Sequence, residues 1–206
     1  MKVVVITGGI GSGKSVACDY LHRKFGFPVY EADGRVKHLY DSHPTLLSEI
    51  EEMLNVGLRA EDGKFVPQKL ASVIFNDGEA LAKVESLVFP ALIDDFDKWT
   101  MNHSDCPAVI LESATILEKP QLGSVGDLIV VIDAPTEVRL ARAAARDDVS
   151  EELILQRMSR QKLMNDISSG LIPAPADVVI ANVGKSEILY EKLDEFVQKY
   201  GITKKL

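Results

Sequence analysis

A glycine-rich stretch near the N-terminus constrains the fold of this 206-residue chain more than any other feature. The β-branched run at residues 3–6 is short and apolar, which predicts a strand buried on both faces of a parallel sheet. Residues 8–15 follow it, read GGIGSGKS and match G-x-x-x-x-G-K-[ST] at every fixed position. With a helix expected to begin near Lys14, the segment predicts the strand, loop and helix of a P-loop.

The residue types in this loop suit the binding of phosphate. Glycines allow positive φ and a close approach of the backbone, so that successive N–H groups can surround an anion, and the helix that follows adds its positive end. Lys14 supplies a mobile charge for the β- and γ-phosphates, and the Ser15 hydroxyl is placed to bind Mg²⁺. The alternative is a glycine-rich connection without a ligand. The predicted nucleotide contacts are Gly9, Ile10, Gly11, Ser12, Gly13, Lys14, Ser15 and Val16.

Composition excludes several other classes of protein. The formal net charge of −8 argues against nucleic-acid binding through a broad basic face. Cys18 and Cys106 are too few for a disulfide framework, and Cys18 is expected to be buried in the first helix. Neither a basic leader with a long apolar run nor an apolar stretch of membrane-spanning length is present, so we expect a cytoplasmic protein without membrane contacts.

Asp33 is a candidate general base. Residues 27–30 predict a short second strand, which delivers Glu31, Ala32 and Asp33 to the edge where open α/β sheets bind ligands. A kinase needs a carboxylate beside the acceptor hydroxyl to orient it and take its proton. From spacing alone, Asp33 could equally cap a helix that begins near Gly34.

Residues 34–105 carry helical patterns and few strand signals. Pro90 is expected to interrupt them, as are other proline and glycine positions. One helical pattern follows another without an intervening strand, which favours a helical lobe inserted into the α/β domain and placed over the acceptor site. Asp94, Asp95 and Asp97 resemble a metal cluster, but on a helix they would spread around it, so a solvated face is the better interpretation.

Three more strands are predicted, which gives an α/β fold with a parallel five-stranded sheet flanked by helices. Residues 107–111 form the third strand, and Glu112 after it is a weak candidate for work near Mg²⁺. The fourth and fifth strands are expected at residues 127–133 and 177–182. A closing amphipathic helix over 186–200 and a frayed tail with Lys204 and Lys205 complete a single domain over residues 1–206.

Residues 136–161 predict a helix, a turn and a second helix that carry a row of arginines. Arg142 and Arg146 lie four residues apart on one helical face. A lid that brings guanidinium groups to a transferring phosphoryl group would have this pattern, since guanidinium bridges phosphate oxygens in pairs. The alternative is a surface helix whose arginines pair with the carboxylates nearby. The arginines are Arg139, Arg142, Arg146, Arg157 and Arg160, and the carboxylates are Asp147, Asp148, Glu151 and Glu152.

The combined motifs resemble the dephospho-coenzyme A kinase family over nearly the full chain. The P-loop alone indicates only a superfamily, but the combination of motifs is specific. The family's Asp-Ala-Asp motif stands here as Glu31, Ala32 and Asp33. The other matching segments are residues 7–15, the run from Arg142 to Asp148, and residues 176–182.

This resemblance implies an in-line transfer of the ATP γ-phosphoryl group to the ribose 3′-hydroxyl of dephospho-coenzyme A, with Mg²⁺ as cofactor and no obligate protein partner. By resemblance Asp33 is the general base, and Lys14 and Arg142 stabilise the transferring group. Arg142 and Arg146 are also lid contacts to the phosphates or adenine of ATP, and Asn182 is a wall of the ATP site. Residues 34–105 become the coenzyme A lobe, and residues 136–161 the lid.

The chain departs from the family pattern mainly in the acceptor half. Pro67 stands where the family usually has arginine, and Phe89 where it usually has histidine. Residues 114–118 replace a Pro-Leu-Leu-x-Glu segment and keep only Glu118. Two other functions therefore stay open: a P-loop kinase for another small acceptor such as a nucleoside or nucleotide, and a nucleotide-dependent switch. The sequence has no Asn-Lys-x-Asp motif for guanine, which disfavours the switch.

Overall fold

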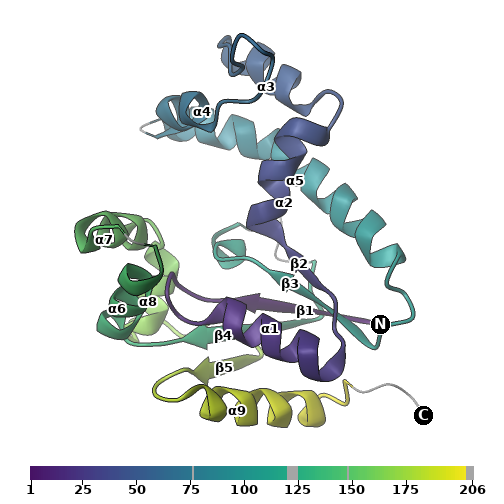
Figure 1. The fold of residues 1–206 in the computed structure, drawn as a ribbon, viewed down its shortest axis with the longest axis vertical. Coiled ribbons are helices and arrows are strands. Elements are labelled where there is room, and N and C mark those ends of the chain that lie inside the picture. Colours follow the sequence, from purple (N-terminus) through teal and green to yellow (C-terminus); the bar gives the residue numbers. More distant parts are fainter. Residues whose placement is uncertain (76, 120–124, 148, 203–206) are drawn as a thin grey trace. The chain divides into compact units, whose positions relative to one another are not determined.

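The chain divides into two compact units (Figure 1). A computed structural model describes residues 1–75, 77–119, 125–147 and 149–202. The first unit, Met1–Glu31 with Asn102–Leu206, contains the sheet, and the second, Ala32–Met101, is helical. The predicted tail residues Lys204 and Lys205 lie outside the described residues. Among the helices that are described, none is both long and apolar enough to cross a membrane.

The first unit is built on a five-stranded parallel sheet, as predicted. Its strands are β1 (Lys2–Thr7), β2 (Val29–Glu31), β3 (Ala108–Glu112), β4 (Leu128–Asp133) and β5 (Val178–Ala181). They lie in the order β2-β3-β1-β4-β5. Every pairing is parallel. Each strand lies within two residues of the segment predicted for it.

Strand β1 occupies the centre of the sheet, and this position places the glycine-rich loop. The chain leaves β1 for β2 on one side, returns through β3, and then crosses to β4 on the other side of β1. Ligands in open α/β sheets bind outside the carboxyl ends of the strands at such a reversal of direction. The register brings Ile6 opposite Glu112 and Thr7 opposite Val131, so the ends of β1, β3 and β4 share one edge.

Alternate residues of the central strand face different helices. Val4 and Ile6 belong to the large core beneath α1 (Lys14–Phe25) and α9 (Ser186–Lys199), while Val5 alternates to the opposite face. On β4, Val131 packs on that opposite face against Met164 of α8 (Lys162–Ser168). Helices on both faces explain why the strands are almost continuously apolar.

Helix α1 begins and ends where the sequence predicted. It starts at Lys14, directly after the glycine loop, and ends before Gly26, whose φ of 71° lies in the left-handed region that glycine tolerates. The N–H of Gly26 donates to the carbonyl of His22, which closes the last turn. Cys18 is buried in this helix, as expected.

The predicted lid segment forms the two helices expected, and a third helix follows it. Residues 136–161 contain α6 (Thr136–Asp147) and α7 (Glu151–Ser159), which match the predicted helix, turn and helix. The Ser150 side chain caps α7 by accepting a hydrogen bond from the Leu153 amide at 3.4 Å. A third helix, α8, follows directly and was not predicted, because its seven residues are too few to show a clear period.

The second unit consists of α2 (Ala32–Ser42), α3 (Leu46–Leu54), α4 (Pro67–Ile74) and α5 (Gly78–Met101). Buried Leu47 and Ile50 of α3, and Val84 and Val88 of α5, lie on the apolar faces expected from the sequence. A paired hydrogen bond also joins α2 to α5: the Arg35 Nε and Nη2 atoms donate to the two Asp95 carboxylate oxygens at 2.8 and 2.7 Å.

The prediction that Pro90 interrupts this region is wrong. Pro90 lies inside α5, which runs unbroken through 24 residues. A proline inside a helix removes one backbone donor, but buried side chains at positions 84, 88, 92 and 96 hold α5 against its neighbours along its whole length. Two aspartates near its C-terminal end make ion pairs: Asp94 pairs with Lys98 on the same helix, and Asp95 pairs with Arg35 of α2.

The closing helix offers a direct test of the packing against the sheet. Leu193 is fully buried in the core beneath α9, whereas Ile188 on the same helix is 44% exposed. Leu193→Ala should lower the free energy of unfolding by about 2–5 kcal/mol, because it removes buried methyl groups and leaves a cavity. The measurement is urea unfolding followed by circular dichroism. Ile188→Ala is the matched control, expected to change stability by no more than about 0.5 kcal/mol; equal losses in both variants would contradict the packing described.

Candidate nucleotide-binding site

The loop between β1 and α1 follows a tight path. The Ser12 amide donates to the Gly9 carbonyl at 3.1 Å. Gly11 and Gly13 have φ values of 76° and 103°, in the left-handed region that L side chains rarely adopt. The backbone therefore turns twice within three residues, which gives successive N–H groups the chance to face one anion.

Lys14 folds back along this loop. Its Nζ atom donates to the Gly8 carbonyl at 2.9 Å and to the Gly9 carbonyl at 3.3 Å. The side chain is half-buried, so its charge stays beside the loop. An ammonium group held by carbonyl oxygens can exchange them for phosphate oxygens, which form stronger charge-assisted bonds. Val16, in the first turn of α1, is 42% exposed.

Asn182 holds the loop from the end of β5. Its Nδ2 atom donates to the Ser12 carbonyl at 2.8 Å. Its own amide donates to the Asp133 carbonyl at 2.7 Å, which fixes the residue beside β4. A Cβ atom at Gly13 would overlap the Asn182 side-chain nitrogen, so this glycine also makes room for the bond. Asn182 thus supports the loop, and its direct contact with ATP stays a prediction.

Gln161 holds the loop at Ile10, a role that no pattern in the sequence indicated. This residue precedes α8 and is 5% exposed. Its Oε1 atom accepts a hydrogen bond from the Ile10 amide at 2.8 Å, and its Nε2 atom lies 3.5 Å from the Ala114 carbonyl, which follows β3. In the sequence, a glutamine between two helices cannot be told apart from any other polar residue at a helix end. Only the fold shows that it joins segments 151 and 47 residues away.

Arg139 is not an exposed arginine of a lid, which corrects the predicted arginine row. Its side chain is fully buried. The helix carrying it packs against the loop so closely that a Cβ atom at Gly9 would overlap the Arg139 guanidinium and one at Gly11 would overlap the Arg139 backbone. The sequence pattern placed Arg139 one turn before Arg142, but helical spacing could not show which face of α6 is covered.

Three of the remaining arginines of this segment divide between two arrangements. Arg142 is half-buried, and its Nη1 atom donates to the Asn182 carbonyl at 3.2 Å. Arg146 donates to both Asp147 carboxylate oxygens, and Arg157 lies 3.8 Å from the same carboxylate. The hydrogen bond from Arg146 lowers the pKa of Asp147 from its ordinary value. The ion pairing considered as the alternative is therefore present at Arg146 and Arg157; Asp148 lies outside the described residues.

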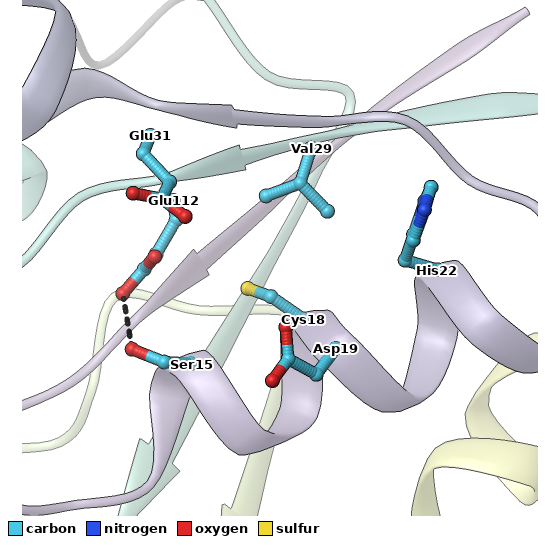
Figure 2. Close-up of a pocket in the computed structure, with 7 residues that line it drawn as sticks. All are labelled: Ser15, Cys18, Asp19, His22, Val29, Glu31 and Glu112. Carbon is cyan, nitrogen blue, oxygen red and sulfur yellow. Dashed lines mark hydrogen bonds between the residues drawn. The ribbon is translucent and has the colours of Figure 1, made fainter.

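Ser15 lies at one end of a cavity of about 250 Å³ beside α1 (Figure 2). Its hydroxyl donates to the Glu112 Oε1 atom at 3.3 Å. Glu31 is the register partner of Glu112 on the neighbouring strand, so two carboxylates end adjacent strands beside Ser15. Cys18 and Asp19 line the cavity farther along α1; burial raises the pKa of the Cys18 thiol well above its ordinary value, so it stays protonated and neutral.

Asp33 lies in the helical unit, in the first turn of α2. The helix begins at Ala32, one residue before Asp33, so the interpretation of Asp33 as the cap of a helix starting near Gly34 is wrong. Its side chain is exposed. The carboxylate is therefore available to a ligand, and its role as a base stays a prediction.

Comparison with known proteins assigns the chain to a family. The profile described as dephospho-CoA kinase matches residues 2–187. The chain belongs to the dephospho-CoA kinase family. A dephospho-CoA kinase of Porphyromonas gingivalis is 36% identical over 184 residues, which cover 88% of this chain and 86% of that relative. A dephospho-CoA kinase of Aquifex aeolicus is 32% identical, and the match covers 97% of this chain and 97% of that relative.

A solved structure supports the same fold for this member of the dephospho-CoA kinase family. A crystal structure from Thermus thermophilus superposes with a TM-score of 0.78 at 26% identity, and the match covers 96% of this chain and 97% of that one. The fold expected from the resemblance is confirmed.

The bond from Gln161 to the loop can be tested by removing its acceptor. Gln161→Leu should weaken ATP binding by about fivefold to 100-fold, because it leaves the partly buried Ile10 amide without its acceptor and releases that end of the loop. Isothermal titration calorimetry gives the dissociation constant. Gln156→Leu on the exposed side of α7 is the control and should bind ATP like the wild type. Equal affinities in both variants would show that this bond does not organise the site.

Proposed function

We propose that this chain catalyses transfer of the γ-phosphoryl group of ATP to the ribose 3′-hydroxyl of dephospho-coenzyme A, giving coenzyme A and ADP, the last step of coenzyme A synthesis. The observation that carries the proposal is a complete phosphate-binding loop, ending in Lys14 and Ser15, within a chain matched by the family profile over residues 2–187. The fold supports it, because this loop lies at the carboxyl edge of the central strand.

The loop accounts for the binding and stabilisation of the phosphates. The contacts from Asn182 and Gln161 hold its backbone before any ligand arrives, so its amides need little rearrangement. Lys14 offsets charge on the β- and γ-phosphates when it exchanges the Gly8 and Gly9 carbonyls for phosphate oxygens. Arg142, tethered to the Asn182 carbonyl, is the lid arginine that we place at the transferring group.

Mg²⁺ fits the oxygen atoms at the end of the cavity in Figure 2. The Ser15 hydroxyl and the Glu112 carboxylate already lie within hydrogen-bonding distance of each other. Hydroxyl and carboxylate oxygens are ligands that Mg²⁺ accepts, directly or through its waters. When bound, the ion would offset the negative charge of the nucleotide phosphates. Ser15 and Glu112 would hold it, and Glu31 adds negative charge beside them.

Asp33 acts as the general base in this mechanism. It accepts the proton of the 3′-hydroxyl and orients that oxygen for in-line attack on the γ-phosphorus. Residues 34–105 form the lobe that binds coenzyme A, and residues 136–161 form the lid that excludes water. ATP and dephospho-coenzyme A are then the partners that the reaction requires, and a cytoplasmic location stays a prediction.

The same site would also suit two other functions. A kinase for another small acceptor would share the phosphate loop and differ in the helical unit, where Pro67 and Phe89 depart from the family pattern. A nucleotide-dependent switch would hydrolyse ATP slowly without an acceptor. The family match favours the first proposal, and a screen of acceptors separates all three.

Neutralising Asp33 tests the base. Asp33→Asn should lower acceptor-dependent release of ADP by about 10²–10⁴-fold, the usual contribution of a general base, while ATP affinity stays near that of the wild type. The assay is ADP release with ATP and Mg²⁺, with and without dephospho-coenzyme A. Asp41→Asn at the other end of α2 is the control and should keep full turnover. Undiminished turnover in Asp33→Asn would contradict the role of Asp33 as general base. A wild type that binds ATP but shows no turnover with dephospho-coenzyme A would contradict the proposed acceptor.

Neutralising Glu112 tests the metal site by binding alone. Glu112→Gln should reduce the enhancement of ATP affinity by Mg²⁺ about tenfold, because one anionic oxygen near the ion is lost. Without Mg²⁺ the variant should bind ATP at least as well as the wild type, since a carboxylate that repels phosphate is gone. Calorimetry with Mg²⁺ or with chelator gives both affinities. Glu187→Gln in α9 is the control. An unchanged Mg²⁺ enhancement in Glu112→Gln would exclude Glu112 from the site.

A further inference from the structure

Arg139 is the largest of the fully buried side chains in the described part of the chain. It lies in the first turn of α6, the helix that follows β4 at the carboxyl edge of the sheet. Arginine is rarely buried completely, because the removal of a charge from water is costly unless a counter-charge pairs with it. A guanidinium with no exposed surface therefore calls for a compensating anion.

Its partners within the described residues do not supply that anion. The Nη2 atom is near two neutral oxygens, Thr136 Oγ1 at 3.3 Å and Asn165 Oδ1 at 3.2 Å. The Nε and Nη1 atoms are buried and have no hydrogen-bond partner among the residues described. The negative charge of Asp133 raises the pKa of Arg139 and so opposes the lowering by burial. The Asp133 carboxylate itself accepts a hydrogen bond from the Ser168 hydroxyl. Burial lowers the pKa of Arg139, yet arginine stays protonated in proteins.

The unpaired side of the guanidinium faces the phosphate-binding loop. A Cβ atom at Gly9 would overlap Arg139 Nη1, so the group lies directly against the second residue of the loop motif. Other unpartnered buried atoms gather at the same place. Of the five such side-chain atoms in the described residues, Thr7 Oγ1 and Ser12 Oγ belong to the loop and its strand, and two belong to Arg139. The base of the loop thus holds a buried positive charge, and buried polar atoms there have no hydrogen-bond partner among the described residues.

We propose that Arg139 is a further positioning residue of this site, whose buried positive charge raises the affinity of the phosphate-binding loop for the di- and triphosphate groups of nucleotides. The charge acts through the loop, across a low-dielectric interior where electrostatic attraction is stronger than in water. Nucleotide phosphates add negative charge to that of Asp133, the carboxylate that already acts on Arg139. The cost of burying Arg139 is then borne by the free enzyme and offset in the complex. This inference rests on the proposed binding of ATP, but not on the identity of the acceptor.

A purely structural role makes different predictions for substitutions. If Arg139 only filled space and held α6 against Gly9, any change of shape would weaken the fold and the site together. If its charge is the contribution, loss of charge should weaken the binding of phosphates and relieve the free enzyme of an unpaired ion. Arg139→Lys keeps the charge, Arg139→Gln keeps polarity without charge, and Arg139→Met keeps much of the volume alone.

The experiment measures binding and stability for the three variants and the wild type. Calorimetry gives the dissociation constants of ATP, ADP and AMP, and urea unfolding without nucleotide gives the stability. We expect the Gln and Met substitutions to weaken ATP binding about tenfold and AMP binding by less than about threefold, with ADP between them. Arg139→Lys should stay within about threefold of the wild type for every nucleotide. The urea midpoints of the two uncharged variants should equal or exceed that of the wild type.

Arg23→Gln is the matched control, because Arg23 is an exposed arginine of α1 whose Nε atom donates to the Asp19 carbonyl one turn earlier in the same helix. It should leave all three affinities unchanged. The inference is overturned if the uncharged variants bind ATP within about twofold of the wild type, or if all three Arg139 variants lose stability and lose affinity equally for ATP and AMP. A wild type that bound no ATP would instead overturn the proposed function.

Discussion

The site depends on keeping an unusual backbone in place without the ligand that it is shaped for. The loop between β1 and α1 has two glycines with left-handed φ, and a backbone hydrogen bond within it runs from the Ser12 amide to the Gly9 carbonyl. Its support comes from distant segments: Asn182 holds Ser12, Gln161 holds Ile10, and α6 packs against Gly9 and Gly11. These supports come from β5, from the junction between α7 and α8, and from the helix after β4. The phosphate site is therefore a product of the whole first unit.

This dependence links the loop to the segment predicted as a lid. Gln161 stands between α7 and α8, and it contacts both the loop and the carbonyl of Ala114 after β3. Asn165, in the first turn of α8, contacts the Arg139 side chain through its Oδ1 atom and the Met158 carbonyl through its Nδ2 atom. A shift of α7 and α8 would strain these bonds. It would act on Ile10 through Gln161, and on Gly9 through Arg139. The closure of this segment on ATP that we propose would therefore be coupled to the phosphate-binding loop.

The sequence predicted the parts whose signal is local. The β-branched run of β1, the fixed spacing of the glycine loop and the stop at Gly26 each depend on neighbours in the chain, and each was placed correctly. Pro90 was misjudged because packing along α5 outweighs the loss of one backbone bond. The first turn of α2 starts before Asp33, since the chain leaves β2 directly into the helix. Gln161 and the burial of Arg139 could not be foreseen, because each depends on contacts between segments far apart in the sequence.

The distribution of unsatisfied polar groups separates what the fold needs from what the function needs. The core beneath α1 and α9 is apolar and closely packed, as a stable domain requires. Around the loop the opposite holds: Thr7, Ser12 and Arg139 bury polar atoms that lack partners within the described residues. A sequence selected for stability alone would have replaced them with apolar groups, since a half-satisfied polar network is worse than an apolar one. They lie in or against the loop at one edge of the sheet, where we propose that nucleotide phosphates offset the charge of Arg139 through the loop. In this proposal, the unfavourable free energy of burying the Arg139 charge in the free protein is offset when phosphates bind, and it therefore adds to their affinity.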